Sequence, residues 1–389
     1  MGAGDRTSLG GYGVTNATQR LVPEQLAWLQ ALRDPLLAKG WTPTEWERVV
    51  RLARRTRLLG RLAEGLLAAG LLDDMPPQVR RHLVAEHRLS RWRTSAVLWT
   101  MERVAVALGD APYPRVLLKG AAYIGQGLPL GVGRLPSDLD VLVPKVHLAD
   151  AQERLARAGW NVKPLDSHDL RYYYEWSHEA PPMTHPLLMV ELDLHHNILP
   201  SMAHAAVDAG RLLAATRPSK LAPWQVLQPL DQVLHSAAHL FFDSEFRDRI
   251  RDLADLDNLL RHFGADPSFL RDLPVRAGEL GLEEPLALAC HFCVRWFGTP
   301  IPQATIRTVE SIGPGRLRRA GLLALFGQVL LPIEPDGRWR PMQSMAATLL
   351  LTRYHLRRLP LRRLVPHLWH KLRSSRRPVR GDDREGIDA

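Results

Sequence analysis

The sequence predicts an α+β protein, in which a small α/β core is flanked by N-terminal and C-terminal helical regions. Two long stretches, before residue 110 and after residue 200, carry apolar residues three to four positions apart, which is typical of helices that bury one face. Between them lie short runs with the composition and alternation of strands, separated by glycine- and proline-rich turns. The 389 residues are 46% hydrophobic and 24% charged, so the chain is long enough for two or three ordinary globular domains.

Changes in composition and periodicity divide the chain into five predicted segments. Residues 1–20 are glycine-rich and polar, and we expect them to be disordered. A helical region is predicted over 21–110, the α/β core over 111–200 and a helical domain over 201–352. A basic tail covers 353–389.

The first helical region begins with a clear start signal. Thr42 can cap a helix, Pro43 suits its first turn, and Glu45 can close a capping box. Apolar residues at helical spacing follow as far as Gly70, which predicts one helix up to that glycine. A second helix is predicted over 77–108.

In the core, predicted strands and helices alternate along the chain. The expected elements are a strand over 115–118, a helix after Lys119-Gly120, a strand over 137–143, a helix over 146–158 and a strand over 189–195. An irregular, aromatic-rich segment lies before the last strand, and only helices are expected beyond Pro200. In the last strand, strict alternation places Glu191, Asp193 and His195 on one face.

Asp138 and Asp140 carry the strongest chemical signal. They lie two apart on one predicted strand, so their side chains point the same way, and neighbouring carboxylates repel each other. A pair of Mg²⁺ ions resolves this conflict, because hard cations bind several carboxylate oxygens. A third carboxylate, Asp193 or Glu191, would complete a two-metal site that aligns an attacking oxygen with a phosphate leaving group.

Lys119-Gly120, between a strand and a helix, predicts a phosphate site. The backbone N–H groups at a helix start point toward the solvent, where they can bind an anion. Lys119 would add charge to this site. A solvated lysine at the end of a strand is the alternative interpretation of Lys119.

These motifs carry a resemblance to a known superfamily. LLKGAA, then GRLPSDLDVLV about eighteen residues later, then a strand ending in ELDLHH, resemble the DNA polymerase β-type nucleotidyltransferases. More closely, the chain is similar to a bacterial family known only as nucleotidyltransferases, with the pattern LKG…R-x-x-SDIDLLV…(D/E)-x-H. Residues 234–260, LHSAAHLFFDSEFRDRIRDLADLDNLL, are similar to that family's His-x-x-x-His…Arg-x-x-Asp-Leu segment. The resemblance covers about residues 112–263, with a looser match before them, and implies a small mixed sheet as the core.

The resemblance also implies roles for single residues. Asp138 and Asp140 match the paired metal-binding acids. Asp193 matches the third acid, which in the superfamily acts as general base toward the acceptor hydroxyl. Gly120 matches the glycine that lets the triphosphate approach the helix. Arg134 matches an arginine that can pair with a phosphate, although it could also tie down its own loop.

The implied cofactor is a two-metal site with Mg²⁺ or Mn²⁺, with Lys119 and Gly120 seating the β- and γ-phosphates. One departure from the superfamily concerns the nucleotide: Ala121 follows Gly120, where a phosphate-binding serine is usual. Glu191 remains the rival of Asp193 for the third acid, because both share one face of the strand.

The leading hypothesis is a transferase that moves a nucleoside monophosphate from an NTP, such as ATP, to an acceptor hydroxyl and releases pyrophosphate. The acceptor, whether small molecule, protein or RNA, stays open. Two alternatives come from other classes: a catalytically inactive nucleotide-binding or scaffold protein of the same fold, and a basic nucleic-acid-binding protein.

The net charge of +10 belongs to the C-terminal segment. Residues 353–380 contain ten Arg or Lys and no acid, and this strip could contact an anionic surface. The longest nearly apolar stretch, 320–333, is too short to span a membrane, and the N-terminus lacks an apolar signal segment. We therefore expect a cytoplasmic bacterial protein without a transmembrane segment.

Three further features favour structural roles. The CHFC sequence at 290–293 has no second cysteine pair, so two buried, reduced thiols are expected rather than a zinc site. His235 and His239 are four apart but lack the glutamate of HExxH, which favours a structural or pocket-lining role. The charged residues of 249–252 are expected to form a salt bridge between helices.

Overall fold

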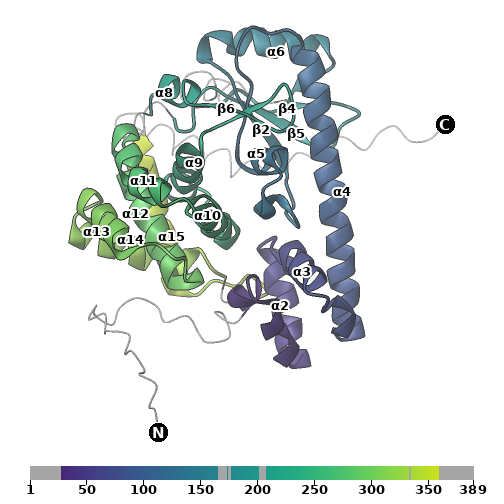
Figure 1. The fold of residues 1–389 in the computed structure, drawn as a ribbon, viewed down its shortest axis with the longest axis vertical. Coiled ribbons are helices and arrows are strands. Elements are labelled where there is room, and N and C mark those ends of the chain that lie inside the picture. Colours follow the sequence, from purple (N-terminus) through teal and green to yellow (C-terminus); the bar gives the residue numbers. More distant parts are fainter. Residues whose placement is uncertain (1–27, 165–172, 174–176, 201–206, 333, 359–389) are drawn as a thin grey trace, which may run out of the picture.

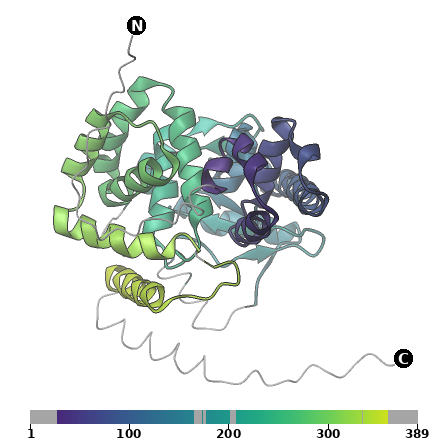
Figure 2. The same cartoon turned by 90° about the horizontal axis from the view of Figure 1, so that it is seen from below.

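A seven-stranded mixed sheet lies between an N-terminal and a C-terminal group of helices (Figures 1 and 2). The structure is a computed structural model and describes residues 28–164, 173, 177–200, 207–332 and 334–358. The predicted disordered segment 1–20 and most of the aromatic-rich segment lie outside these residues. The predicted α+β class with flanking helical regions is confirmed.

The N-terminal helices are α2 (Pro43–Arg55), α3 (Leu59–Ala68) and α4 (Pro77–Leu108). Thr42 caps α2 in a complete capping box with Glu45, as predicted. The single helix expected up to Gly70 is wrong, because the chain turns between α2 and α3, where Arg57 has a φ of +56°. The turn lets Leu58 bury completely, and the hydroxyl of Thr56 closes the end of α2 by donating to the carbonyl of Leu52 at 2.9 Å.

The sheet has the strand order β3-β4-β5-β2-β1-β7-β6. Its strands are β1 (Val116–Leu117), β2 (Asp138–Leu142), β3 (Asn161–Val162), β4 (Met183–Thr184), β5 (Glu191–His195), β6 (Arg217–Pro218) and β7 (Gln225–Val226). The central pair, β2 and β5, is parallel, and β1 joins β2 in antiparallel orientation. The last two strands lie beyond Pro200, so the expectation of helices alone in that region is wrong.

Two helices of the core pack with these strands. Helix α5 (Lys119–Gln126) follows β1, and α6 (Leu148–Arg157) follows β2, each close to its predicted position. The strand interiors are apolar: Leu139, Val141, Leu192 and Leu194 are fully buried. Side chains alternate along a strand, so the acidic residues between these buried positions lie on the opposite face of β2 and β5 and point away from this part of the core.

The C-terminal helices are α8 (Ala209–Leu213), α9 (Pro229–Phe242), α10 (Ile250–Phe263), α11 (Pro267–Leu280), α12 (Glu283–Phe292), α13 (Gln303–Ile312), α14 (Arg316–Val329) and α15 (Pro341–Arg358). Helix α9 packs against both α10 and α12. Cys290 and Cys293 are buried free thiols, as predicted, and burial raises the pKa of both. No helix among the described residues is long and apolar enough to cross a membrane.

The start of the predicted basic tail is part of the folded body. Helix α15 continues across residue 353, and Arg353 and Arg357 both pair with Glu284 of α12. Two of the tail's cations are therefore engaged by an acid within the chain. Residues 359–389 lie outside the described part of the chain.

Candidate functional site

Three predicted carboxylates come together at one end of the central strand pair. The parallel register sets Asp140 opposite Asp193 and Asp138 opposite Glu191. Asp138, Asp140 and Asp193 each offer an oxygen within 4.8 Å of the others'. Glu191 is not part of this group, because its carboxylate accepts from Lys163 Nζ at 2.7 Å. The geometry thus favours Asp193 over Glu191 as the third acid.

Asp140 is the most constrained of these acids. It is 4% exposed, and its Oδ1 accepts from Lys119 Nζ at 3.1 Å and from His195 Nε2 at 2.9 Å. Burial alone would raise the pKa of Asp140, but Lys119 and His195 outweigh it and hold that pKa well below its usual value. Asp140 is therefore a carboxylate at neutral pH.

The pKa of Asp193 is shifted in the opposite direction to that of Asp140. Burial and the neighbouring charge of Asp140 raise the pKa of Asp193 to about 7. Its buried Oδ1 has no hydrogen-bond partner among the described residues. A cation placed among the three carboxylates would relieve both the repulsion and the unpaired oxygen, so an all-oxygen, strongly acidic donor set fits a hard divalent metal.

The start of α5 differs in detail from the predicted phosphate seat. Lys119 is the first helical residue and has a φ of +44°, and its ammonium group points to Asp140 rather than into the solvent. A Cβ at Gly120 would lie 3.0 Å from Nη1 of Arg134. The close neighbour of Gly120 in the structure is therefore the side chain of Arg134. Phosphate binding by Lys119 and Gly120 stays a prediction.

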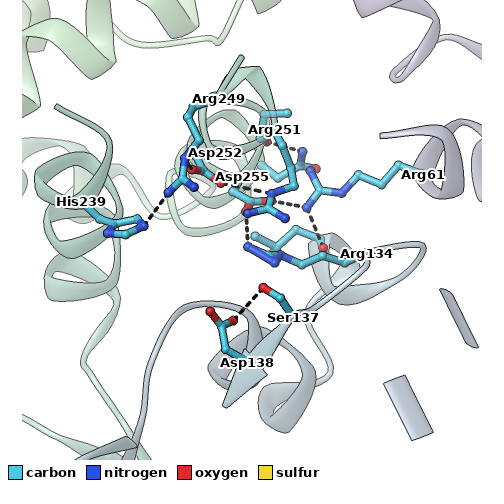
Figure 3. Close-up of polar contacts among 12 residues, drawn as sticks. Arg61, Arg134, Ser137, Asp138, His239, Arg249, Arg251, Asp252 and Asp255 are labelled. Carbon is cyan, nitrogen blue, oxygen red and sulfur yellow. Dashed lines mark hydrogen bonds and ion pairs between the residues drawn. The ribbon is translucent and has the colours of Figure 1, made fainter. Parts of the chain in front are cut away.

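Arg134 is buried in an ion-pair network that joins the core to α10. Its Nη2 donates to Asp255 at 2.9 Å, and its guanidinium lies over the ring of Tyr123. Arg61 of α3 also pairs with Asp255, so one acid serves two arginines (Figure 3). The Nε of Arg134 is buried and has no partner among the described residues. This leaves Arg134 with a donor for a further anion.

A cavity of about 460 Å³ is lined by Asp138 and Asp140, while Asp193 is not among its lining residues. One side, which we name the sheet wall, is formed by the cavity-lining residues of 119–120 and 137–140. The other side, the helical wall, is formed by the cavity-lining residues of 55–57 and 245–252. The sheet wall carries Asp138 and Asp140, two of the three acids of the predicted metal site, and the helical wall is rich in arginine.

The predicted salt bridge in 249–252 forms within one segment and not between helices. Arg249 and Arg251 both pair with Asp252, at 2.6 and 3.2 Å, at the start of α10 (Figure 3). Arg249 also donates to Nε2 of His239 at 2.7 Å, which does join α10 to α9. Burial and the charge of Lys119 lower the pKa of His239, so its imidazole is neutral and accepts this bond. His239 lines the cavity and His235 is buried, in keeping with the role expected for the pair.

Comparison with known families agrees with this geometry. A family described as "Uncharacterised nucleotidyltransferase" matches residues 42–298, about two thirds of the chain. The chain belongs to this nucleotidyltransferase family. No curated protein and no solved structure matches it. The match starts at the cap of α2, so the family's domain includes the N-terminal helices as well as the sheet.

Two parts of the helical wall, residues 55–57 and 245–248, were not indicated by the sequence, whereas the charged residues of 249–252 were. Arg55 and Arg57 lie at a turn that the helical periodicity concealed, and Arg247 lies in the connection between α9 and α10. The only local signal was the gap in apolar spacing between Ala53 and Leu58. That gap marks the turn but not its neighbours in space.

A second group of side chains that could bind a metal lies next to Asp140. His178, Glu179 and His195 each offer an atom within 4.8 Å of the others'. Nδ1 of His195 lies 3.6 Å from Glu179, while its Nε2 bonds to Asp140. Glu179 and His195 thereby orient Asp140 from its buried side.

Proposed function

We propose that the protein transfers a nucleoside monophosphate from an NTP to an acceptor hydroxyl, with release of pyrophosphate. The observation that carries this proposal is the meeting of Asp138, Asp140 and Asp193 on paired strands, two of which, Asp138 and Asp140, line a cavity rich in cations. Membership of a nucleotidyltransferase family supports the same class of reaction.

Asp138, Asp140 and Asp193 would hold Mg²⁺ or Mn²⁺. When bound, two such ions neutralise charge on the reacting phosphate and lower the pKa of a coordinated hydroxyl. The fit rests on the all-carboxylate donor set and on the unpartnered Oδ1 of Asp193. Lys119, which pairs with Asp140, keeps a positive charge beside the α5 N-terminus, where polyphosphate would bind.

Residues of the chain itself would orient the triphosphate and take up the proton of the acceptor. Arg134, with its unpartnered Nε, and the α5 N-terminus would orient the triphosphate, which aligns the leaving group. The acceptor oxygen forms a bond to the α-phosphorus while the bond from that phosphorus to the β-bridging oxygen breaks. The acceptor's proton would pass to the carboxylate of Asp193, the residue that matches the superfamily's general base.

The cavity is lined by two serine hydroxyl groups, although the serine that usually follows the glycine is absent after Gly120. Ser137 and Ser236 both line it, and Ser236 belongs to α9. The Ser137 hydroxyl donates to Asp138 Oδ1 at 3.2 Å, so Ser236 is the hydroxyl that would donate to a phosphate oxygen in place of the absent side chain. This observation favours an active enzyme over an inactive nucleotide-binding protein of the same fold.

The test incubates the purified protein with each α-labelled NTP and Mg²⁺ or Mn²⁺, with and without host-cell lysate. Asp138→Ala is the matched control, because Asp138 is only half-buried while Asp140 holds a buried ion pair. We expect label transfer by the wild type and a loss of at least about 10³-fold in the variant, since metal ligation contributes several kcal/mol at the transition state.

Calorimetry on the same samples separates the alternatives. Metal-dependent NTP binding without any labelled product, under every acceptor condition, would favour the inactive nucleotide-binding protein. Equal labelling by wild type and Asp138→Ala would exclude the metal site as proposed. Affinity for RNA or DNA that falls steeply with salt and is lost on removing residues 353–389 would favour the nucleic-acid-binding alternative.

A further inference from the structure

The helical wall bears two arginines that the proposed reaction has not used. We propose that Arg57 and Arg247 form an anion subsite, and that the acceptor of the nucleotidyl group therefore carries a phosphate or carboxylate. This inference rests on the proposed nucleotidyl transfer and deepens it, because it names a substrate class for the open side of the cavity.

An ion pair joins the two segments that carry these arginines. Arg55 Nε donates to Oδ2 of Asp248 at 2.9 Å, across 193 residues of sequence. Arg57 lies two residues after Arg55, and Arg247 lies one residue before Asp248. The backbone N–H of Asp248 also donates to the carbonyl of Val329, which anchors this segment to α14. The segments that carry Arg57 and Arg247 are thus held together by the Arg55–Asp248 ion pair.

The pairing of charges distinguishes these two arginines from the other cations of the cavity. Each of the others has an acid: the pairs are Lys119–Asp140, Arg55–Asp248, Arg134–Asp255, Arg249–Asp252 and Arg251–Asp252. Within the described ranges, neither Arg57 nor Arg247 has an acidic partner. The guanidinium of Arg247 instead lies 4.5 Å from the ring centre of Trp339, which orients its plane and leaves its N–H groups open.

Backbone strain is concentrated at the same place. Arg57, Lys119 and Asp248 are the non-glycine residues with positive φ among those described, at +56°, +44° and +56°. All three line this cavity. Side chains other than glycine adopt this conformation at a cost, and such strain gathers where a structure must aim particular groups. Two of the three positions belong to the helical wall.

The position of the subsite suits an acceptor. In the proposed reaction, polyphosphate would bind beside the acids, at the α5 N-terminus and the unpartnered Nε of Arg134. Arg57 and Arg247 come from segments outside the sheet, on the other wall. A guanidinium can bind the two oxygens of a phosphate or a carboxylate at once. An acceptor held there by its anionic group can present its hydroxyl to the sheet wall.

The test uses the full chain with its nucleotide site already filled. The protein is saturated with Mg²⁺ and an α,β-methylene NTP analogue, and inorganic phosphate or succinate is then titrated in by calorimetry. The variant is Arg57→Gln/Arg247→Gln. The matched control is Arg307→Gln/Arg316→Gln, two exposed arginines of α13 and α14 that do not line the cavity. The first titration reports nucleotide binding separately from anion binding.

We expect one anion site per chain in the wild type and in the control, and at least about tenfold weaker binding in Arg57→Gln/Arg247→Gln. Affinity for the analogue should stay within about twofold in all three proteins. The stronger of the two probes tells a phosphate-bearing acceptor from a carboxylate-bearing one.

Three results would overturn the inference. In the first, no anion binds the nucleotide-saturated wild type. In the second, the variant loses affinity for the analogue, which would assign both arginines to the nucleotide's own phosphates. In the third, the analogue fails to bind at all, which removes the proposed function and with it the acceptor role, even if phosphate binds through Arg57 and Arg247.

Discussion

The two walls of the cavity are built in different ways. On the sheet wall, Asp138 and Asp140 lie two residues apart on one strand, and the ladder to β5 sets their distance from Asp193. On the helical wall, the charged groups lie at helix ends and turns, and ion pairs such as Arg55–Asp248 hold them. A strand converts sequence spacing directly into geometry, whereas a turn has to be placed by tertiary contacts. The acids of the sheet wall can therefore be predicted from the sequence, whereas on the helical wall only the charged residues of 249–252 stand out in it.

The largest effect should separate the two candidate acids of the sheet wall. Asp193→Asn should lower nucleotidyl transfer by about 10³-fold, because it removes both a metal ligand and the base. Glu191→Gln should change it by less than about twofold, since a half-exposed ion pair with Lys163 contributes at most about 1 kcal/mol. Label transfer from α-labelled NTP under saturating metal measures both rates.

Circular dichroism of both variants controls for folding. A strong loss in Glu191→Gln together with an active Asp193→Asn would reverse the assignment of the third acid.

A smaller effect is expected on the free energy of unfolding, which should differ between variants of Asp140 and Asp138 on the same strand. Asp140→Ala leaves Lys119 and His195 without their carboxylate in a buried site, which should lower the free energy of unfolding by about 3–5 kcal/mol. Asp138→Ala should change it by about 0.5 kcal/mol or less, because the one hydrogen bond of the Asp138 side chain among the described residues is a 3.2 Å bond from Ser137. Urea unfolding measures both values, and equal destabilisation would contradict the ion-pair description of Asp140.

The contrast between the walls also marks how much the sequence could predict. The capping box at Thr42, the bounds of α4 and the pairing of Asp138 with Asp140 follow from patterns within a few residues, and the structure has these helices where the patterns place them. The choice between Asp193 and Glu191 stayed open, because both alternate onto one face of the strand and their distance from Asp138 depends on the strand register. The two-residue strands β6 and β7 are too short to show a period, and Pro218 disfavours a strand. The partners of Arg55 and Arg134 lie 193 and 121 residues away, so no local pattern contains them.

The third prediction uses the raised pKa of Asp193. With that pKa at about 7 in the metal-free protein, metal must displace a proton at lower pH, so Mg²⁺ affinity should fall about tenfold per pH unit below 7 and level off above it. Because the folded-state pKa exceeds the unfolded value, the metal-free fold binds the extra proton between about pH 4 and 7. Its stability should therefore decrease as pH rises through that window.

Mn²⁺ or Mg²⁺ titrations between about pH 5.5 and 8 check the first trend, and urea unfolding without metal checks the second. Asp193→Asn should remove the pH dependence of the metal affinity and that of the metal-free stability. A wild-type metal affinity that does not depend on pH would show that Asp193 is already ionised, and the cluster would then be less repulsive than described.

The smallest expected effect tests whether the helical wall trades stability for function. Arg57→Gly removes the penalty of a side chain at φ +56° and should raise the free energy of unfolding by about 0.5–1 kcal/mol. Arg57→Gln keeps the strained backbone and loses the same charge, so it should bring no such gain. Both should weaken phosphate binding alike. Urea unfolding of the pair isolates the strain, because the two variants differ in backbone freedom and share the loss of the cation. If Arg57→Gly proves no more stable than Arg57→Gln, the turn between α2 and α3 holds no strain, and the unpaired charge alone would support the anion subsite.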